Sequence, residues 1–332
     1  MDTKRNDLPN LLRNTKPKVL LIGGNKNQIT MLHKISEHLQ PCDCFFSPYF
    51  YSDTIISVFR KWGLTQSSTL GSRMQKITID YLTNNDLQMD IGGRTHKYDL
   101  AIILTDIMDS SNLKNVKKVL VQEGLIIPEG LKYFFVKTLP IPLWLLNANA
   151  AGLSNDYDYF CVASKGYYDE FVKQGIDRNK LVVTGIPNFD NIVNEHSNKK
   201  FEIHDFILLA THCHREDFEF ENRKKLLHKT RELANGRQIV VKLHPRENFN
   251  RAIKEIHRYL PNARVFTDGD TEAMIANCEI FITSFSSTIF TALLLGKEVH
   301  CNISLDRVKK LAPLQNGQAA RNIANICIGA IM

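Results

Sequence analysis

The sequence lacks the features of a secreted, membrane-spanning or nucleic-acid-binding protein. Its first fifteen residues are polar and charged, so they do not resemble a secretory signal. The most apolar stretch, Leu139–Leu153, contains two prolines and two asparagines and is too short and too interrupted to cross a bilayer. The basic residues are not interleaved with aromatic ones as in a nucleic-acid interface. We therefore expect a cytoplasmic protein with no nucleic-acid partner.

Cysteine is present, but without the spacing of a disulfide framework. The seven cysteines are an odd number and are scattered along the chain, which indicates reduced thiols in the cytoplasm. Cys42-Asp43-Cys44 lacks the second half of a metal site, so we interpret it as part of a loop with no assigned role. The formal net charge of +7 favours anionic small molecules or peripheral contact with an anionic inner membrane, although scattered solvated lysines would give the same total.

The length and the order of patterns predict two α/β domains. At 332 residues the chain is long for one hydrophobic core. Short apolar runs alternate with helical patterns, as in chains built from βαβ units with parallel sheets. Residues 194–204 are polar and without periodicity, and we interpret them as a linker. We predict one Rossmann-like domain over residues 1–193 and a second over 205–332, with their parallel sheets facing across a cleft.

Three predicted strands in the second half are each followed by residues with cationic, imidazole or hydroxyl side chains. The clearest is Gln238–Leu243, which runs into His244 and Pro245, and the proline prevents a strand or helix from continuing. Because ligands bind at the carboxyl ends of strands in open parallel sheets, we predict a site for the phosphate of a nucleotide-linked donor. A serine before a helix is also a common N-cap. The predicted donor-binding residues are His214, Arg215, Lys242, His244, Arg246, Ser284, Ser286, Ser287 and Thr288.

The same strand ends contain side chains that suit a metal ion as well. Imidazole and thiolate groups are ligands of zinc, but no aspartate or further histidine follows a matching strand. The positive charges of Arg215 and Lys242 would also repel a cation. We therefore expect no metal ion and no other cofactor. The side chains of this disfavoured cluster are His212, Cys213, His214, His244 and Cys301.

In the first half, the most informative residue is Glu123, which lies just past a predicted buried strand and before Gly124. A carboxylate there would project into the cleft, and burial would raise its pKa toward that of a general base. A surface or helix-initiating glutamate is the simpler alternative. Gly23-Gly24 allows close approach of the backbone but lacks the third glycine of a dinucleotide fingerprint. The loops that we expect at the cleft contain Gly23, Gly24, Asn25, Gly185 and Asn188.

Three segments resemble landmarks of the GT-B glycosyltransferases. They are V-T-G-I-P-N-F-D at Val183–Asp190, K-L-H-P-R-E at Lys242–Glu247 and I-T-S-F-S-S-T-I-F at Ile282–Phe290. The most similar groups act in capsule, lipopolysaccharide and teichoic-acid synthesis, together with the related nucleotide-sugar 2-epimerases. The resemblance covers most of the chain. It implies two Rossmann-like domains, a donor bound to the C-terminal one, and no required metal.

Within this superfamily, three short motifs look like those of bacterial sialyl- and Kdo-type transferases. Glu123-Gly124 corresponds to a motif whose acid is the general base, and His244-Pro245 and Ser286-Ser287 correspond to motifs that hold the CMP moiety. The resemblance therefore implies that Glu123 deprotonates the acceptor hydroxyl and that His244 and the two serines bind the donor phosphate. In addition, residues 214–217 resemble the His-Arg-Glu-Asn loop of the 2-epimerases.

The sequence departs from related enzymes at two places. UDP-sugar enzymes and epimerases usually have a ribose-binding glutamate after the serine motif, whereas Thr288–Ala292 contains no acid. This difference favours a cytidine donor. Glycerophosphate transferases usually have His-Gly where this chain has Glu123-Gly124, which disfavours that subclass.

The resemblance thus predicts an inverting, metal-independent glycosyltransferase. Its donor is expected to be a nucleotide sugar, with a CMP-sugar favoured, and its acceptor a cell-envelope glycan or a lipid-linked molecule. Three alternatives stay open: a UDP-GlcNAc 2-epimerase-like enzyme, a CDP-glycerol-type glycerophosphotransferase, and a nucleotide-binding protein of the same fold without catalytic activity.

Overall fold

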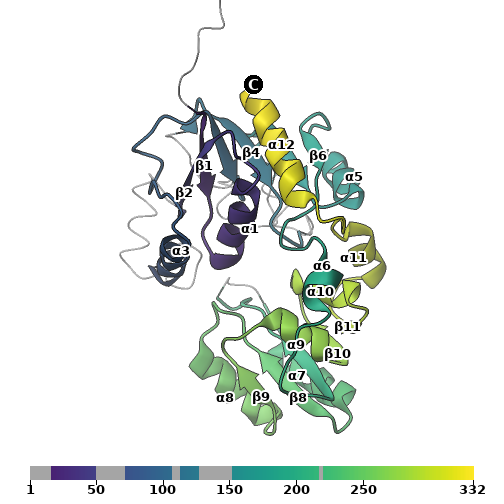
Figure 1. The fold of residues 1–332 in the computed structure, drawn as a ribbon. Helices are drawn as coiled ribbons and strands as arrows, with labels where there is room; N and C mark the ends of the chain where they lie inside the picture. The colour runs from purple at the N-terminus through teal and green to yellow at the C-terminus, as the bar shows by residue number, and fades with distance from the viewer. Residues whose placement is uncertain (1–15, 50–71, 107–112, 127–151, 217–219) are drawn as a thin grey trace, which may run out of the picture.

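The computed structural model describes five segments of the chain. They are residues 16–49, 72–106, 113–126, 152–216 and 220–332. Figure 1 shows two α/β lobes, one built mainly from the first half of the sequence and the other from the second half. Each lobe contains one parallel sheet, which confirms the predicted α/β class with two parallel sheets.

The sheet of the first lobe has six described strands in the order β2-β1-β3-β4-β5-β6, and all of its pairings are parallel. Its central strands are almost wholly apolar and buried, as expected where helices cover both faces of a parallel sheet. The strands are β1 (Lys18–Ile22), β2 (Asp43–Ser47), β3 (Leu100–Ile103), β4 (Lys117–Val121), β5 (Tyr159–Val162) and β6 (Leu181–Val183). The helices in this half of the sequence are α1 (Lys26–Ser36), α3 (Ser72–Asn84), α5 (Lys165–Lys173) and α6 (Ile192–His196).

The sheet of the second lobe has five strands in the order β11-β10-β7-β8-β9, again all parallel. Its strands are β7 (Phe206–Ala210), β8 (Gln238–Lys242), β9 (Arg264–Phe266), β10 (Ile280–Thr283) and β11 (Glu298–His300). The helices are α7 (Arg223–Ala234), α8 (Phe249–Tyr259), α9 (Thr271–Asn277), α10 (Thr288–Leu294), α11 (Leu305–Leu311) and α12 (Ala319–Ile331).

Strand β7 divides its side chains between two hydrophobic cores. Because successive side chains of a strand point to opposite faces, Ile207 and Leu209 pack with side chains of α7 and α8. Phe206, Leu208 and Ala210 belong instead to a core that continues into the first lobe. The two lobes therefore share one continuous apolar core, which lies on the face of the second sheet opposite α7 and α8.

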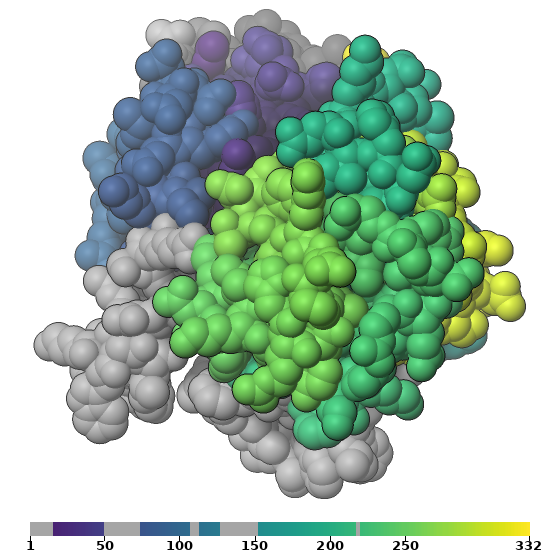
Figure 2. All heavy atoms as spheres, turned by 90° about the horizontal axis from the view of Figure 1, so that it is seen from below, coloured from purple at the N-terminus to yellow at the C-terminus, as the bar shows by residue number. Residues whose placement is uncertain are grey.

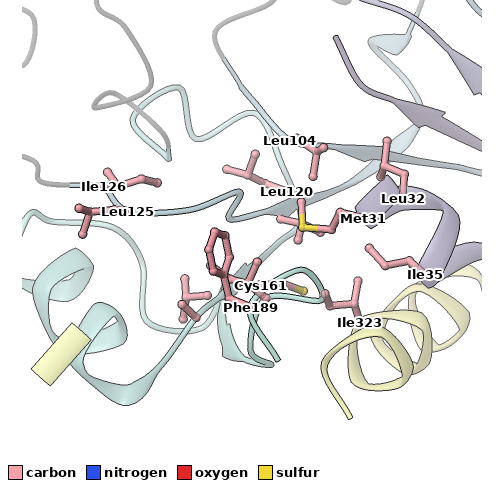
Figure 3. Packing of buried hydrophobic residues seen from close by; sticks show 14 of the residues in the cluster. Met31, Leu32, Ile35, Leu104, Leu120, Leu125, Ile126, Cys161, Phe189 and Ile323 are labelled. Atoms are coloured by element: carbon pink, nitrogen blue, oxygen red, sulfur yellow. The ribbon is translucent and has the colours of Figure 1, made fainter. Parts of the chain in front are cut away.

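The last helix, α12, returns to the first lobe, where it packs against α1, β3 and β4. Figure 3 shows Ile35 of α1 and Ile323 of α12 in the same core. The carboxylate of Asp190 caps α12, because its two oxygens accept bonds from the N–H groups of Gly317 and Ala319, each at 2.8 Å. Residues 205–332 were expected to form the second domain, so this placement differs from the expectation. Helix α12 is apolar and must bury its surface against another apolar surface. That surface is formed by α1, β3 and β4, which lie far from α12 in the sequence.

The interpretation of Cys42-Asp43-Cys44 as a loop is wrong for the last two residues, which begin the edge strand β2. Only five residues form this strand, and they contain no β-branched side chain, so the sequence signal is weak. Most of Leu139–Leu153 lies outside the described residues. None of the helices in the described part of the chain is long and apolar enough to cross a membrane.

Candidate functional site

The carboxylate of Glu123 lies at the carboxyl end of the first sheet, two residues after β4, and is half-buried. Its Oε2 accepts a hydrogen bond from Gln28 Nε2 at 2.5 Å, and its Oε1 accepts one from Asn25 Nδ2 at 3.4 Å. Burial raises the pKa of Glu123, while these amide hydrogen bonds and the nearby charge of Arg246 oppose that rise. A carboxyl group with a raised pKa suits proton transfer near neutral pH.

Gln28 is a site residue that the sequence interpretation missed. It is 4% exposed, and its Oε1 accepts a bond from the N–H of Gly24 at 2.6 Å, which leaves Nε2 to face Glu123. Asn25 is the N-cap of α1 and accepts a bond from the N–H of Gln28 at 2.9 Å. The pattern Asn-x-x-Gln after a strand is close to a capping box, and that signal would have found it.

Gly124 brings the two lobes into direct contact. A Cβ atom on Gly124 would lie 2.2 Å from Ser287 Oγ, so only glycine fits. The next residue, Leu125, donates its N–H to the same hydroxyl at 2.8 Å. Ser287 precedes α10 but makes no side-chain capping bond there, so its hydroxyl contacts the loop after β4 instead of serving as an N-cap.

Three strand ends of the second lobe converge on a group of rings. The His212 ring lies 4.3 Å from that of His214, 5.5 Å from that of His244 and 6.1 Å from that of Phe285, measured between centroids. His214 Nε2 is also 3.1 Å from Ser284 Oγ. The structure therefore brings together the loops after β7, β8 and β10, as expected from their positions at the carboxyl ends of neighbouring strands.

Arg246 contacts the loops of this ring group and also acts electrostatically on Glu123. Its Nη2 donates to Cys213 Sγ at 2.7 Å, and its backbone N–H donates to His244 Nδ1 at 3.2 Å. Its charge also lowers the pKa of Glu123 against the effect of burial. A cation of the second lobe is thus close to the carboxylate of the first.

The other two predicted cations have protein partners. The Lys242 Nζ donates to the carbonyl of Leu243 at 3.1 Å, and burial lowers the pKa of this amine. Arg215 forms a bidentate pair with Glu255 of α8, with N–O distances of 3.1 and 2.9 Å. These contacts hold both side chains within the second lobe.

The hydroxyl groups of the serine-rich turn contact each other before α10 begins. Ser286 Oγ is 2.7 Å from Thr288 Oγ1 and accepts a bond from the N–H of Thr288 at 3.3 Å. The first turn of α10 contains no acidic residue.

A buried charged network supports the loops after β7 and β8, and the sequence interpretation missed it. Arg223 is 4% exposed, and its guanidinium contacts Glu247 Oε1 at 2.5 Å and Glu221 Oε2 at 2.7 Å. It also donates to the carbonyl of His212 at 3.3 Å, and Glu247 accepts the N–H of His244 at 2.9 Å. Nothing in the sequence distinguishes Arg223 from the solvated cations that follow it.

Several of the glycine and asparagine positions predicted for the cleft have packing roles. A Cβ on Gly24 would lie 2.0 Å from the ring of Tyr49, and one on Gly23 would lie 3.1 Å from Leu32 Cδ1. Gly185 has φ +87°, a left-handed conformation that favours glycine. Asn188 donates to the carbonyl of Asn27 at 2.7 Å and so ties the loop after β6 to α1.

Within the described part of the chain, no three histidine, cysteine, aspartate or glutamate side chains are arranged to hold a metal ion. The ring of His212 is tilted against those of His214 and His244 and meets the ring of Phe285 edge-to-face. The candidate site consists of the Glu123 carboxylate, which Gln28 and Asn25 hold, and of Arg246 and the histidine and hydroxyl groups at the strand ends of the second lobe.

One family model and several solved structures are similar to this chain. The family model described as CDP-Glycerol:Poly(glycerophosphate) glycerophosphotransferase matches residues 147–299. This range contains all of β5 to β10 and α10, and therefore every predicted donor-binding residue. A search of curated proteins gave no match.

Solved structures with the same architecture include epimerases and a polymerase. A putative UDP-N-acetylglucosamine 2-epimerase from Listeria monocytogenes is 13% identical, with a TM-score of 0.59 over 96% of this chain and 88% of its own. UDP-GlcNAc 2-epimerase from Neisseria meningitidis, bound to UDP-GlcNAc, is 14% identical, with a TM-score of 0.55 over 95% and 91%. The wall teichoic acid polymerase TagF, soaked with CDPG, is 11% identical, with a TM-score of 0.53 over 95% and 88%. These similarities show a GT-B-like α/β fold.

Proposed function

We propose that this protein is a transferase that takes an activated group from a nucleotide-linked donor and passes it to an acceptor hydroxyl. The observation that supports the proposal is the contact between the lobes at Gly124 and Ser287, because it joins the turn that contains Glu123 to the second lobe, whose Arg246 lowers the pKa of that carboxylate. A group that can accept a proton and groups that can bind an anion thereby lie at one place.

In the proposed reaction the first lobe supplies the general base and the second lobe binds the donor phosphate. Glu123 accepts the proton of the acceptor hydroxyl, and base catalysis of this kind contributes about 10²–10⁴-fold to the rate. His244, Arg246 and the serine-rich turn stabilise the negative charge that develops on the leaving nucleotide phosphate. No step in this scheme requires a metal ion.

For the transferred group, our first candidate is a sugar from a cytidine-linked donor, delivered with inversion to a cell-envelope glycan or glycolipid such as a capsule or lipopolysaccharide precursor. The absence of an acid in the first turn of α10 supports cytidine over uridine. Glu123 supports a glycosyl group, since a glutamate in this turn resembles the general base of sialyl- and Kdo-type transferases.

The second candidate for the group is glycerophosphate, and the family match over residues 147–299 favours it. In that reaction the acceptor oxygen attacks the phosphorus atom next to glycerol, and CMP leaves. The two candidates share the cytidine donor and the role of Glu123, and they differ in which bond of the donor breaks. Analysis of the products from CMP-sugars and CDP-glycerol separates them.

A 2-epimerase with the same fold remains the main alternative, because two of the similar structures are epimerases. Such an enzyme would convert UDP-GlcNAc without an acceptor. Incubation with UDP-GlcNAc alone therefore tests it, and formation of the 2-epimer would contradict the transferase proposal.

The decisive experiment for the donor is a thermal-shift screen over CMP, CDP, UDP and GDP. A ligand that binds only the folded protein raises its apparent stability. We expect the largest shift with CMP or CDP. A clear preference for UDP would contradict the cytidine donor, and the absence of a shift with all four would contradict the donor site.

A further inference from the structure

The positive charge of the chain is concentrated on two neighbouring helices. Helices α7 and α8 contain eight lysines and arginines against two glutamates, a formal charge of +6, whereas the whole chain carries +7. The rest of the chain is therefore nearly neutral in total. A random scatter of solvated lysines does not explain this distribution.

Some of these charges are neutralised within the protein. Arg223 belongs to the buried network, and Arg251 pairs with Glu216 at 2.5 Å. Glu255 pairs with Arg215 of the loop after β7 at 2.9 Å. The cations that remain exposed, which we term the α7–α8 basic face, are Lys224, Lys225, Lys229, Arg231, Lys254 and Arg258.

The α7–α8 basic face lies on the outer layer of the second lobe. The two helices pack against each other and cover the side of the sheet that does not join the first lobe. The rings of His228 and Tyr259 lie 5.4 Å apart across their contact. Of the carboxylates on these two helices, only Glu232 is exposed. Seen from below, the second lobe forms the centre of the molecular surface (Figure 2).

An exposed aromatic residue precedes this face in the sequence. Phe220 is 92% exposed and precedes α7, four residues before Lys224. An aromatic ring in full contact with water is costly, whereas at a membrane surface the ring enters the boundary between headgroups and acyl chains. Cations alone would suit any polyanion, but cations with an exposed phenylalanine suit a lipid surface.

We propose that the α7–α8 basic face and Phe220 form a docking surface for membranes that contain anionic lipids. The cations are attracted to the negative surface potential, and Phe220 inserts at the interface. The two ion pairs that join α8 to residues 215 and 216 connect this surface to the loop that contains His214. The proposal goes beyond the proposed function and does not require it.

Co-sedimentation with vesicles tests the docking surface. The full chain is mixed with phosphatidylcholine vesicles that contain about one-third phosphatidylglycerol, and in parallel with pure phosphatidylcholine vesicles. We expect binding to the first and little to the second, with a loss of binding at high salt. Each lysine near an anionic membrane strengthens binding roughly fivefold, so K224E/K225E/K229E should reduce the partition coefficient at least about 100-fold.

A matched variant shows whether vesicle binding depends on the charge of the α7–α8 basic face or on the net charge of the whole protein. K173E/R178E/K200E changes the net charge by the same amount at exposed positions of other elements and should bind nearly as the wild type does. Phe220→Ser should weaken binding by a smaller factor that high salt does not remove. Equal binding by the two triple variants would overturn the proposal. Tight binding to soluble polyphosphate with none to vesicles would overturn it too, and would assign the face to a polyanionic partner.

Discussion

Two glutamates at the carboxyl ends of the two sheets have opposite surroundings. Glu123 follows β4 and receives hydrogen bonds from the neutral amides of Gln28 and Asn25. Glu247 follows β8, is 5% exposed and forms a close ion pair with Arg223. The ion pair of Glu247 with Arg223 holds loops in place, whereas burial raises the pKa of Glu123 against its amide hydrogen bonds, which suits the exchange of a proton.

The largest expected effect on stability comes from replacing Arg223, the cation that pairs with Glu247. Arg223→Met leaves Glu247 and Glu221 buried without their charged partner and should lower the free energy of unfolding by about 3–5 kcal/mol. Urea denaturation measures this change. The control is Arg237→Met, which breaks the exposed pair with Glu279 and should cost less than about 1 kcal/mol. Equal effects would show that the buried network is not the support of these loops.

The contact between the lobes gives the next largest effect. Gly124→Ala places a methyl group against Ser287 Oγ, so the turn that contains Glu123 must move, at a cost of about 1–3 kcal/mol. We expect turnover to fall while the spectrum of secondary structure is unchanged. Ser287→Gly removes the obstructing atoms, and the double variant should recover part of the activity lost by Gly124→Ala. A double variant no better than the single one would mean that this contact does not position Glu123.

The smallest effect concerns the amides around Glu123. Gln28→Leu removes a hydrogen bond that lowers the pKa of Glu123, so the pKa should rise further. Because the base is active when deprotonated, the acid limb of the pH profile of kcat/KM should move to higher pH. Above the limb, turnover should stay within about tenfold of the wild type.

The matched control for this variant is Gln40→Leu, which changes an exposed glutamine just after the same helix that donates to the carbonyl of Glu37. Its pH profile should coincide with that of the wild type. If the acid limb of the pH profile of Gln28→Leu did not shift, Gln28 would have no influence on the pKa of the catalytic base.

The sequence predicts the strand ends well because their signals are local. The apolar run before His244 and the proline after it define the end of β8 without any long-range information. The pairing of Glu123 with Gln28 involves residues 95 positions apart, so it depends on how the strands are ordered in the sheet. The same is true of α12, which packs against α1, β3 and β4 from the first half of the chain.

Arg223 shows a different limit of sequence reasoning. It stands at the start of a helix rich in exposed cations, and it is buried in ion pairs with Glu221, two residues before it, and with Glu247 from the loop after β8. Charge alone therefore does not distinguish a structural arginine from a solvated one. The edge strand β2 was not predicted, because it pairs with one neighbouring strand and contains no β-branched residue that would indicate a strand.

The central claim is that Glu123 acts on a proton while the second lobe binds the nucleotide. The most direct test measures nucleotide affinity and turnover together in Glu123→Gln and His244→Ala, using the nucleotide and donor that the screen selects. We predict that Glu123→Gln lowers kcat by about 10²–10⁴-fold and changes the nucleotide Kd by less than about threefold, whereas His244→Ala weakens nucleotide binding. Wild-type turnover in Glu123→Gln would contradict the claim.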